Sequence, residues 1–171
     1  MLHRSAVISP CGKFRYLLLR VWDDKLPAIT FCMLNPSRAD GEVDDPTLLT
    51  CVAFAKALGY GRLRIVNMYA YRATDPKDLK AAGWQVGPEN DAHLVDAFAS
   101  GDPVICAWGV NARGQLRQAQ VLDMVRMWTT PLALAVSKDG VPLHPLYLNR
   151  DLVPFDLDAA VPSVEVETEG W

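Results

Sequence analysis

Four polar segments hold most of the side chains in this sequence that could do chemistry, and each one follows an apolar run. The first, NPSRADGEVDD, contains Asn35, Asp40 and Asp44, and the fourth, SKDGVPLHPLYLNR, contains His144. Carboxylate and amide oxygens can position a water molecule or stabilise a developing positive charge, and an imidazole can donate a hydrogen bond to a leaving group. These residue types favour a hydrolytic site.

The second segment, NMYAYRATDP, and the third, WGVNARGQ, add amide, aromatic and basic side chains to this set. The candidate residues from all four segments are Asn35, Ser37, Arg38, Asp40, Asp44, Asn67, Tyr69, Tyr71, Arg72, Trp108, Arg113, Lys138, His144, Leu146 and Tyr147.

The apolar runs predict the elements that would position these residues. AVISP and KFRYLLLRVW are typical of two short strands in a hairpin, and PAITFCML is typical of a strand covered on both faces. Further strands are expected in RLRIVNMYA, DPVICAWG and TPLALAV, and helices in PKDLKAAG and ENDAHLVDAFASG. A longer helix is expected over residues 113–128, with Leu116, Leu122, Val125 and Trp128 as its buried side.

A further helix is predicted directly after the first polar segment. Asp45 is a suitable N-cap, and Pro46 suits the first helical position. Apolar residues then recur at Leu48 and Val52 on one face before Gly59 ends the helix. Asp45 is therefore assigned to the helix cap, which leaves Asp40 and Asp44 as the candidate catalytic acids.

Strands that alternate with helices predict a three-layer α/β/α sandwich with a mostly parallel central sheet. Ligands of open parallel sheets bind in the crevice beyond the carboxyl ends of the strands. The four polar segments should meet there, so we expect Asn35, Asn67 and His144 to surround one cavity.

Length and composition predict one globular domain over residues 1–160, followed by an acidic tail at 161–171. The chain has 171 residues, of which 50% are apolar, and contains neither an apolar run long enough to cross a membrane nor an N-terminal signal-like segment. A cytoplasmic protein without membrane association is expected. The four cysteines lie far apart in the sequence, and we expect them to be reduced.

The charge is unevenly distributed along the chain. The net charge is −3, but residues 151–171 hold six acids and no Lys or Arg. The first 150 residues therefore contain 17 basic and 14 acidic residues, a net charge of +3. A local positive surface that binds a polyanion is compatible with this distribution.

The motifs MLNPSRADGEVDDPT, VNMYAYRATDP, VGPEND and SKDGVPLHPLYL resemble the bacterial and phage family catalogued as domain-of-unknown-function family 1643. Three of the polar segments, with Asn67 at a strand end, also resemble motifs of the uracil-DNA glycosylase superfamily, in the same order. Leu34-Asn35-Pro36-Ser37 is similar to the first motif of its mismatch-specific branch, and Trp108-Gly109 with Ala112 to a strand-end Trp-Gly-x-x-Ala pattern. His144-Pro145-Leu146-Tyr147 is similar to its His-Pro-Ser-Pro loop, with Leu in place of Ser.

The resemblance implies a DNA glycosylase with a uracil-DNA-glycosylase-like fold, in which the residue at Asn35 positions the hydrolytic water and the residue at Asn67 reads an extruded base. The usual acid of the first motif in the uracil-specific branch has no counterpart here, so the expected target is another modified or damaged pyrimidine. Because phages carry modified bases, a modified cytosine and a role in phage defence are the expectation. We expect a monomer that acts on duplex or single-stranded DNA and requires no cofactor and no metal.

Cleavage of an N-glycosidic bond needs a stabilised sugar cation, a positioned water and a leaving base whose negative charge is tolerated. Asn35 with Asp44 or Asp40 would serve the first two needs, and His144 the third. The extruded base would be read and stacked upon by Asn67, Tyr69, Tyr71 and Trp108. DNA contacts are expected from Ser37, Arg38, Arg72, Arg113 and Lys138, and Leu146 or Tyr147 could enter the gap that the base leaves.

Two other classes of function fit the same residues. In a metal-dependent phosphoesterase or nucleotide hydrolase, Asp40, Asp44, Asp45 and His144 would be metal ligands. A non-catalytic nucleic-acid-binding module would bind DNA in a salt-sensitive way without base release.

Overall fold

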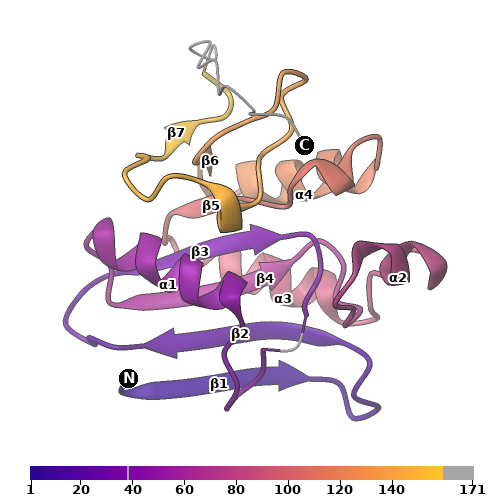
Figure 1. The fold of residues 1–171 in the computed structure, drawn as a ribbon, viewed down its shortest axis with the longest axis horizontal. Coiled ribbons are helices and arrows are strands. Elements are labelled where there is room, and N and C mark those ends of the chain that lie inside the picture. Colours follow the sequence, from indigo (N-terminus) through magenta and orange to yellow (C-terminus); the bar gives the residue numbers. More distant parts are fainter. Residues whose placement is uncertain (38, 160–171) are drawn as a thin grey trace.

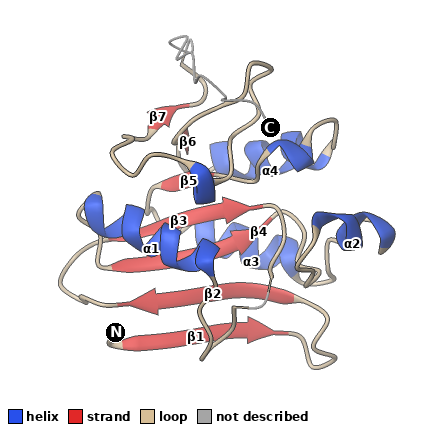
Figure 2. Ribbon diagram, in the orientation of Figure 1, coloured by secondary structure: helices blue, strands red, loops and turns tan. Residues whose placement is uncertain are grey.

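The computed structural model describes residues 1–37 and 39–159, in which seven strands form one mixed sheet (Figures 1 and 2). The strands are β1 (His3–Ile8), β2 (Arg15–Val21), β3 (Ala28–Met33), β4 (Arg62–Asn67), β5 (Val104–Cys106), β6 (Pro131–Ala133) and β7 (Phe155–Asp156). Their order across the sheet is β1-β2-β4-β3-β5-β6-β7. The pairings β4–β3, β3–β5 and β5–β6 are parallel, whereas β1–β2, β2–β4 and β6–β7 are antiparallel. The parallel arrangement that the sequence predicts is therefore limited to the four central strands.

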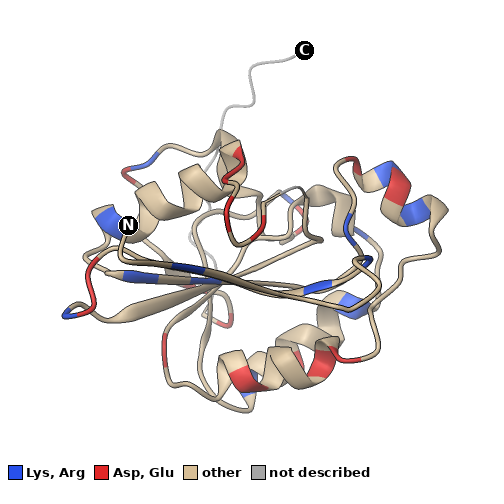
Figure 3. Ribbon diagram, turned by 90° about the horizontal axis from the view of Figure 1, so that it is seen from below, with Lys and Arg blue, Asp and Glu red and all other residues tan. Residues whose placement is uncertain are grey.

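Helices lie on both sides of this sheet, as the view along its edge shows (Figure 3). They are α1 (Pro46–Ala57), α2 (Pro76–Ala81), α3 (Asn90–Phe98) and α4 (Arg117–Arg126), with short 3₁₀ helices at Val110–Ala112 and Pro145–Tyr147. On one face, Leu48 and Phe54 of α1 pack with strand residues such as Phe31. On the other, Phe98 of α3 and Val121 of α4 pack with a second set of strand residues. Both faces of the central strands are thus covered.

The start of α1 agrees with the sequence prediction. Asp45 is the N-cap, and the backbone N–H of Leu48 donates to its Oδ1 at 2.8 Å. Pro46 occupies the first turn, and Leu48 and Val52 are buried as expected. This cap fixes the point at which the first polar segment becomes helix.

The last helix is shorter than predicted. α4 begins at Arg117 instead of residue 113 and buries Arg117, Val121 and Val125. Leu116 and Trp128 lie outside its ends and are 83% and 50% exposed. The backbone before α4 forms the Val110–Ala112 3₁₀ helix and a turn at Gly114 (φ 75°), which delays the helix start and displaces the expected buried side.

A β-bulge interrupts the regular alternation of β2. Val7 pairs with Leu17 and Ile8 with Arg15, so Tyr16 is an extra residue on β2. Tyr16 consequently stacks on His93 of α3, with ring centroids 4.9 Å apart. Arg15 lines the same cavity as Leu18, although residues three apart in a regular strand would face opposite sides. The bulge therefore directs the Arg15 side chain to the α1 face of the sheet.

Three further expectations concern the chain as a whole. No helix among residues 1–37 and 39–159 is long and apolar enough to cross a membrane. All four cysteines are free, with Cys11 exposed and Cys32, Cys51 and Cys106 buried. The predicted acidic tail, residues 161–171, lies outside the described residues.

Candidate active site

A cleft of about 560 Å³ lies beyond the carboxyl ends of β3, β4 and β5, and all four predicted polar segments contribute to it. Its lining residues are Arg15, Leu18, Met33, Leu34, Asn35, Ser37, Ala39, Asp45, Thr47, Leu48, Ile65, Asn67, Ala73, Thr74, Pro76, Trp108, Gly109, Val110, Asn111, Leu143, His144, Leu146, Tyr147 and Leu148. Asn35, Asn67 and His144 thus share one cavity, as the order of strands and polar segments predicts.

Asn35 follows β3 and is held by the loop after β4. Its Nδ2 donates to the carbonyl oxygen of Ala73 at 2.8 Å and to that of Pro36 at 3.2 Å. The Ala73 N–H donates in turn to the Pro36 carbonyl at 2.9 Å. Because these bonds occupy Nδ2 and not Oδ1, the Asn35 amide oxygen has no hydrogen-bond donor among the described residues and can accept a bond from a water molecule.

Asn67 ends β4 and is 2% exposed. The end of this strand is fixed from the opposite face of the sheet, where Asn90 donates to the backbone oxygens of Asn67 and Met68, and Arg117 Nε to that of Met68. The Asn67 side chain faces the cleft, and its Oδ1 accepts a hydrogen bond from Arg15 at 3.3 Å. An amide whose oxygen is engaged in this way presents its N–H₂ to a ligand.

His144 lies in the segment after β6, next to the loop after β5. The Leu146 N–H donates to its Nδ1 at 3.3 Å, so the neutral ring carries its proton on Nε2. Burial lowers the pKa of His144 below its ordinary value of 6.5, and the negative charge of Asp45 opposes part of this effect. The ring is therefore a neutral hydrogen-bond donor at neutral pH.

Gly109 allows this close approach of the two loops. Its φ of 81° favours glycine, and a Cβ built there would lie 3.1 Å from the His144 Cβ. The packing of His144 thus explains why a glycine follows Trp108.

Asp45 is the acid that the structure brings to the cleft. Besides capping α1, it accepts a hydrogen bond on Oδ2 from the Ser37 hydroxyl. In the glycosylase hypothesis drawn from the sequence, Asp45 serves only as the helix cap, but here the capping carboxylate also lines the cleft.

Asp40 and Asp44, the acids predicted as catalytic, do not line the cleft. Asp40 Oδ1 accepts from the backbone N–H groups of Glu42 and Val43, which lowers the pKa of Asp40. Asp44 forms ion pairs with Arg20 at 2.8 Å and Arg4 at 3.3 Å. Both carboxylates therefore stabilise the loop that carries them instead of facing a ligand.

Arg15 is a charged cleft residue that is not among the candidates predicted from the sequence. It is 4% exposed and donates to the Ala39 carbonyl at 2.6 Å as well as to Asn67. Within the predicted strand KFRYLLLRVW, the bulge at Tyr16 is what turns the Arg15 side chain toward the cleft. A bulge has no clear signature in a single sequence, so no sequence signal could have identified Arg15.

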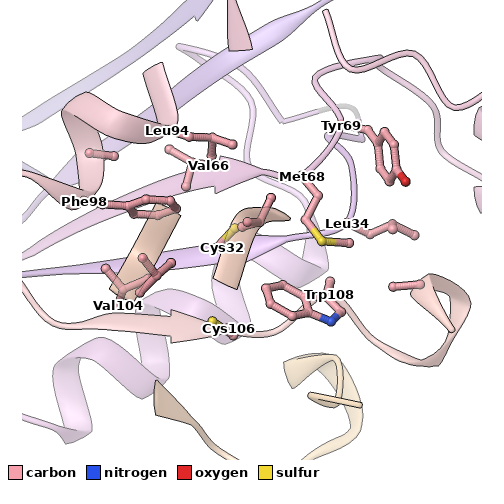
Figure 4. Packing of buried hydrophobic residues seen from close by; sticks show 14 of the residues in the cluster. Cys32, Leu34, Val66, Met68, Tyr69, Leu94, Phe98, Val104, Cys106 and Trp108 are labelled. Carbon is pink, nitrogen blue, oxygen red and sulfur yellow. The ribbon is translucent and has the colours of Figure 1, made fainter. Parts of the chain in front are cut away.

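The predicted aromatic residues are distributed over three places. Tyr69 and Trp108 belong to the core on the α3–α4 face (Figure 4), at 3% and 1% exposure. Trp108 still touches the cleft, and its Nε1 donates to Gln118 at 2.9 Å. Tyr69, in contrast, does not line the cleft and packs against Trp84, with ring centroids 5.3 Å apart and the ring planes tilted by 48°.

Tyr71 lines a smaller pocket next to the cleft, which we call the side pocket. It has a volume of about 320 Å³ and is lined by Gly12, Lys13, Ser37, Tyr71, Arg72, Ala73 and Thr74. Since Ser37, Ala73 and Thr74 line both cavities, the side pocket and the cleft adjoin.

The predicted DNA-binding residues are also divided. Leu146 and Tyr147 border the cleft, where Tyr147 is 89% exposed. Arg72 lies in the side pocket, whereas Arg113 forms an exposed ion pair with Asp139. Lys138 is exposed and lines neither cavity, and Arg38 lies outside the described residues.

No group of three or more His, Cys, Asp or Glu side chains in the described ranges is arranged to hold a metal ion. In particular, Asp40 and Asp44 have the partners given above and do not gather with His144.

These features define an α/β protein with a ligand-sized cleft at the carboxyl ends of its central parallel strands. The chain belongs to the family described as Protein of unknown function (DUF1643), whose model matches residues 15–146. No curated protein matches the chain. Among solved structures, it is similar to the hetero-hexameric glutamate dehydrogenase from Thermus thermophilus in its Leu-bound form, with 20% identity and a TM-score of 0.31. The match covers 72% of this chain and 29% of the dehydrogenase, and so weak a likeness carries no argument.

Proposed function

We propose that this protein is a monomeric, cytoplasmic DNA glycosylase that removes a modified or damaged pyrimidine and leaves an abasic site. The proposal treats the chain as a divergent relative of the uracil-DNA glycosylase superfamily, with that superfamily's three-layer sandwich. Its main support is the shared cleft of Asn35, Asn67 and His144, three residues that lie far apart in the sequence. Modified cytosines of the kind found in phage DNA are the first substrates to test.

The cleft has the size and polarity that an extruded base requires. Its volume of about 560 Å³ lies within the usual range of small-molecule sites, and most of its lining is apolar. Flipping a base out of the stack costs a few kcal/mol, which contacts in such a pocket can offset. In the proposed complex, Asn67 binds the base edge, and exposed Tyr147 or neighbouring Leu146 fills the gap in the duplex.

The reaction we propose is attack of water on C1′ of the sugar. Asn35 Oδ1 orients the water, and Asp45 stabilises the positive charge that develops on the sugar. The electron pair of the broken N-glycosidic bond moves to the base, and the Nε2–H of neutral His144 donates a hydrogen bond to it. The attacking water releases one proton to solvent as the new C1′–O bond forms, and the departed base takes one proton from solvent. This scheme assigns to Asp45 the role that the sequence suggested for Asp44 or Asp40, because Asp45 lines the cleft.

The direct test is incubation with oligonucleotides that each carry one modified pyrimidine, followed by alkali to cut at abasic sites. We expect cleavage at one class of modified base and a loss of about 10²-fold or more for Asn35→Ala, the scale seen when one positioning group is removed from a site. Asp139→Asn, which alters an exposed ion pair outside both cavities, is the matched control. Intact DNA with every modified base would contradict the proposal, and loss of activity with a chelator would favour the phosphoesterase alternative.

A further inference from the structure

Arg15 differs from the other buried arginines in having no carboxylate partner. Three arginines in the described residues are less than a tenth exposed, namely Arg15, Arg20 and Arg117. Arg20 pairs with Asp44 and Arg117 with Asp91, whereas no ion pair reaches Arg15 within the described part of the chain. A buried charge without a partner is costly, so such a residue calls for a functional explanation.

The surroundings of Arg15 compensate its charge only in part. Its guanidinium donates to the Ala39 carbonyl and to Asn67 Oδ1, but its Nε has no hydrogen-bond partner among the described residues. Burial lowers the pKa of Arg15 to about 10, and nearby Arg72 and Arg20 act in the same direction. Asp45 and Asp40 oppose this shift, but neither lies within ion-pair distance of Arg15. Arg15 nevertheless stays charged at neutral pH.

The charged groups of the cleft match the charges that the proposed reaction creates. Among the described residues, Arg15 and Asp45 are the only Lys, Arg, Asp or Glu side chains that line the cleft. Cleavage of an N-glycosidic bond produces a positive charge on the sugar and a negative charge on the base. Asp45 can stabilise the first, but neutral His144 offers only a dipole to the second.

We propose that Arg15 is a catalytic residue whose guanidinium binds the departing pyrimidine and stabilises its negative charge. This inference rests on the glycosylase function proposed above and names a residue outside the motifs that suggested that function. Preorganised positive charge in a water-poor site is an effective way to stabilise a developing anion.

The position of Arg15 favours the base over a phosphate as its partner. Arg15 is bound to Asn67, the residue proposed to read the base, and apolar Leu18 and Ile65 line the cleft with it. The cationic residues of the side pocket, Lys13 and Arg72, are more accessible and suit phosphate contacts better. A heterocycle fits the apolar surroundings of Arg15, whereas a hydrated phosphate does not.

The test compares the binding of two free pyrimidines that differ in charge. Calorimetry at pH 7.5 would measure uracil, which is neutral, and 5-nitrouracil, whose electron-withdrawing group leaves the ring ionised at this pH. We expect the wild-type protein to bind the ionised base at least about tenfold more tightly, the change that 1.4 kcal/mol produces. Arg15→Gln should abolish this preference, Arg15→Lys should retain part of it, and Arg126→Gln, which alters an exposed ion pair with Asp158, should leave it unchanged.

Several outcomes would overturn the assignment. Equal affinity for the two bases, binding of neither, or an unchanged preference in Arg15→Gln each contradicts it. Inorganic phosphate is the second probe: if phosphate binds in an Arg15-dependent way and the ionised base does not, Arg15 serves a phosphate. Thermal melting of each variant shows whether it is folded. If Arg15→Gln does not fold, the affinities of the wild-type protein and of Arg15→Lys for the two bases still test the assignment.

The binding assay separates this inference from the proposed function. An Arg15-dependent preference for the ionised base in a protein that releases no base from DNA would support the anion site and reject the glycosylase. Base release at the wild-type rate by Arg15→Gln would support the glycosylase and reject the role of Arg15.

Discussion

Strand β2 carries two buried arginines, and their surroundings differ. Arg20 is 0% exposed, and its Nε donates to Asp44 at 2.9 Å while its other nitrogens donate to the Leu19, Asp40 and Val43 carbonyls. Arg4 also pairs with Asp44, and we call Arg4, Arg20 and Asp44 the Arg20 cluster. Arg15, five residues earlier, has two hydrogen bonds, an unpartnered Nε and no carboxylate.

The comparison separates charge that holds the fold from charge that is available to a ligand. The Arg20 cluster satisfies its own groups and ties β2 to the loop after β3, so a ligand has nothing to add there. At Arg15 the protein keeps a desolvated cation beside a cavity. An incompletely satisfied buried charge costs stability, and beside a cavity it is a candidate for a functional role.

The largest expected effect is on stability, at Arg20. Arg20→Gln should lower the free energy of unfolding by about 3–5 kcal/mol, because it leaves the mostly buried Asp44 carboxylate without its main partner. Arg15→Gln should change it by no more than about 1 kcal/mol, because the lost hydrogen bonds are offset by removal of a buried charge. Urea denaturation of both variants measures the difference. Equal losses of unfolding free energy would mean that Arg15, like Arg20, serves to stabilise the fold.

A second pair of variants compares two adjacent acids, Asp44 and Asp45. Asp45→Asn should keep stability within about 0.5 kcal/mol, because Asn is an equally good N-cap, and should slow base release by about 10²-fold. Asp44→Asn should lower stability, because it weakens the Arg20 cluster, and should leave the rate of base release by the folded protein unchanged. Single-turnover kinetics and denaturation on the same samples provide the two readouts. If Asp44→Asn alone slows base release, the acid assignment from the sequence was right.

The pH dependence of base release tests His144. Its pKa is lowered by burial, so the neutral ring is present at pH 7. Protonation of Nδ1 removes the acceptor of the Leu146 N–H and with it the bond that orients the ring, so the rate should fall as the pH drops below 6.5 and through the pKa of the folded protein. His144→Gln should remove this acid limb and reduce the rate by about 10²-fold. Stability should also fall as the pH is lowered through 6.5, because the unfolded chain binds the proton more tightly. An acid limb that persists in His144→Gln belongs to another group.

The smallest expected effect is on DNA affinity, at Arg72 in the side pocket. Arg72→Gln should weaken oligonucleotide binding a few-fold and reduce the slope of log affinity against log salt by about 0.7–0.9, the contribution of one phosphate contact. Lys25→Gln, in the exposed β2–β3 turn, is the control. Fluorescence anisotropy at several salt concentrations measures both. An unchanged slope would show that the side pocket does not bind a phosphate.

The sequence predicts well those features that depend on local pattern. The β1–β2 hairpin, the buried β3 strand and the Asp45 cap of α1 follow from alternation, apolar runs and Asp-Pro chemistry. The convergence of Asn35, Asn67 and His144 follows from the rule on carboxyl ends of parallel strands, because that rule requires only strand order and direction.

Long-range contacts account for what the sequence could not predict. Two contacts decide which of the three acids faces the cleft. Arg20, more than 20 residues away in the chain, pairs with Asp44, and backbone N–H groups within the loop hold Asp40, which leaves Asp45 at the cleft. The exposure of Leu116 and Trp128 depends on where α4 starts, which the turn at Gly114 determines. The antiparallel edges of the sheet likewise depend on pairings, such as β6 with β7, that apolar runs alone do not specify.

Because of the β-bulge at Tyr16, the direction of the Arg15 side chain depends on the lengths of β1 and β2 to within one residue. Inserting one residue into β1 between Val7 and Ile8 would give Tyr16 a partner and restore even alternation, so that Arg15 would point to the α3 side. Deleting Tyr16 would instead leave Arg15 two residues from Leu18, on the same face. Homologues and engineered chains that lengthen β1 by this one position should therefore lose ligand recognition while keeping their sheet. Insertions are tolerated in most surface hairpins, but here the insertion point between Val7 and Ile8 has to stay closed, because it lies opposite the extra residue Tyr16.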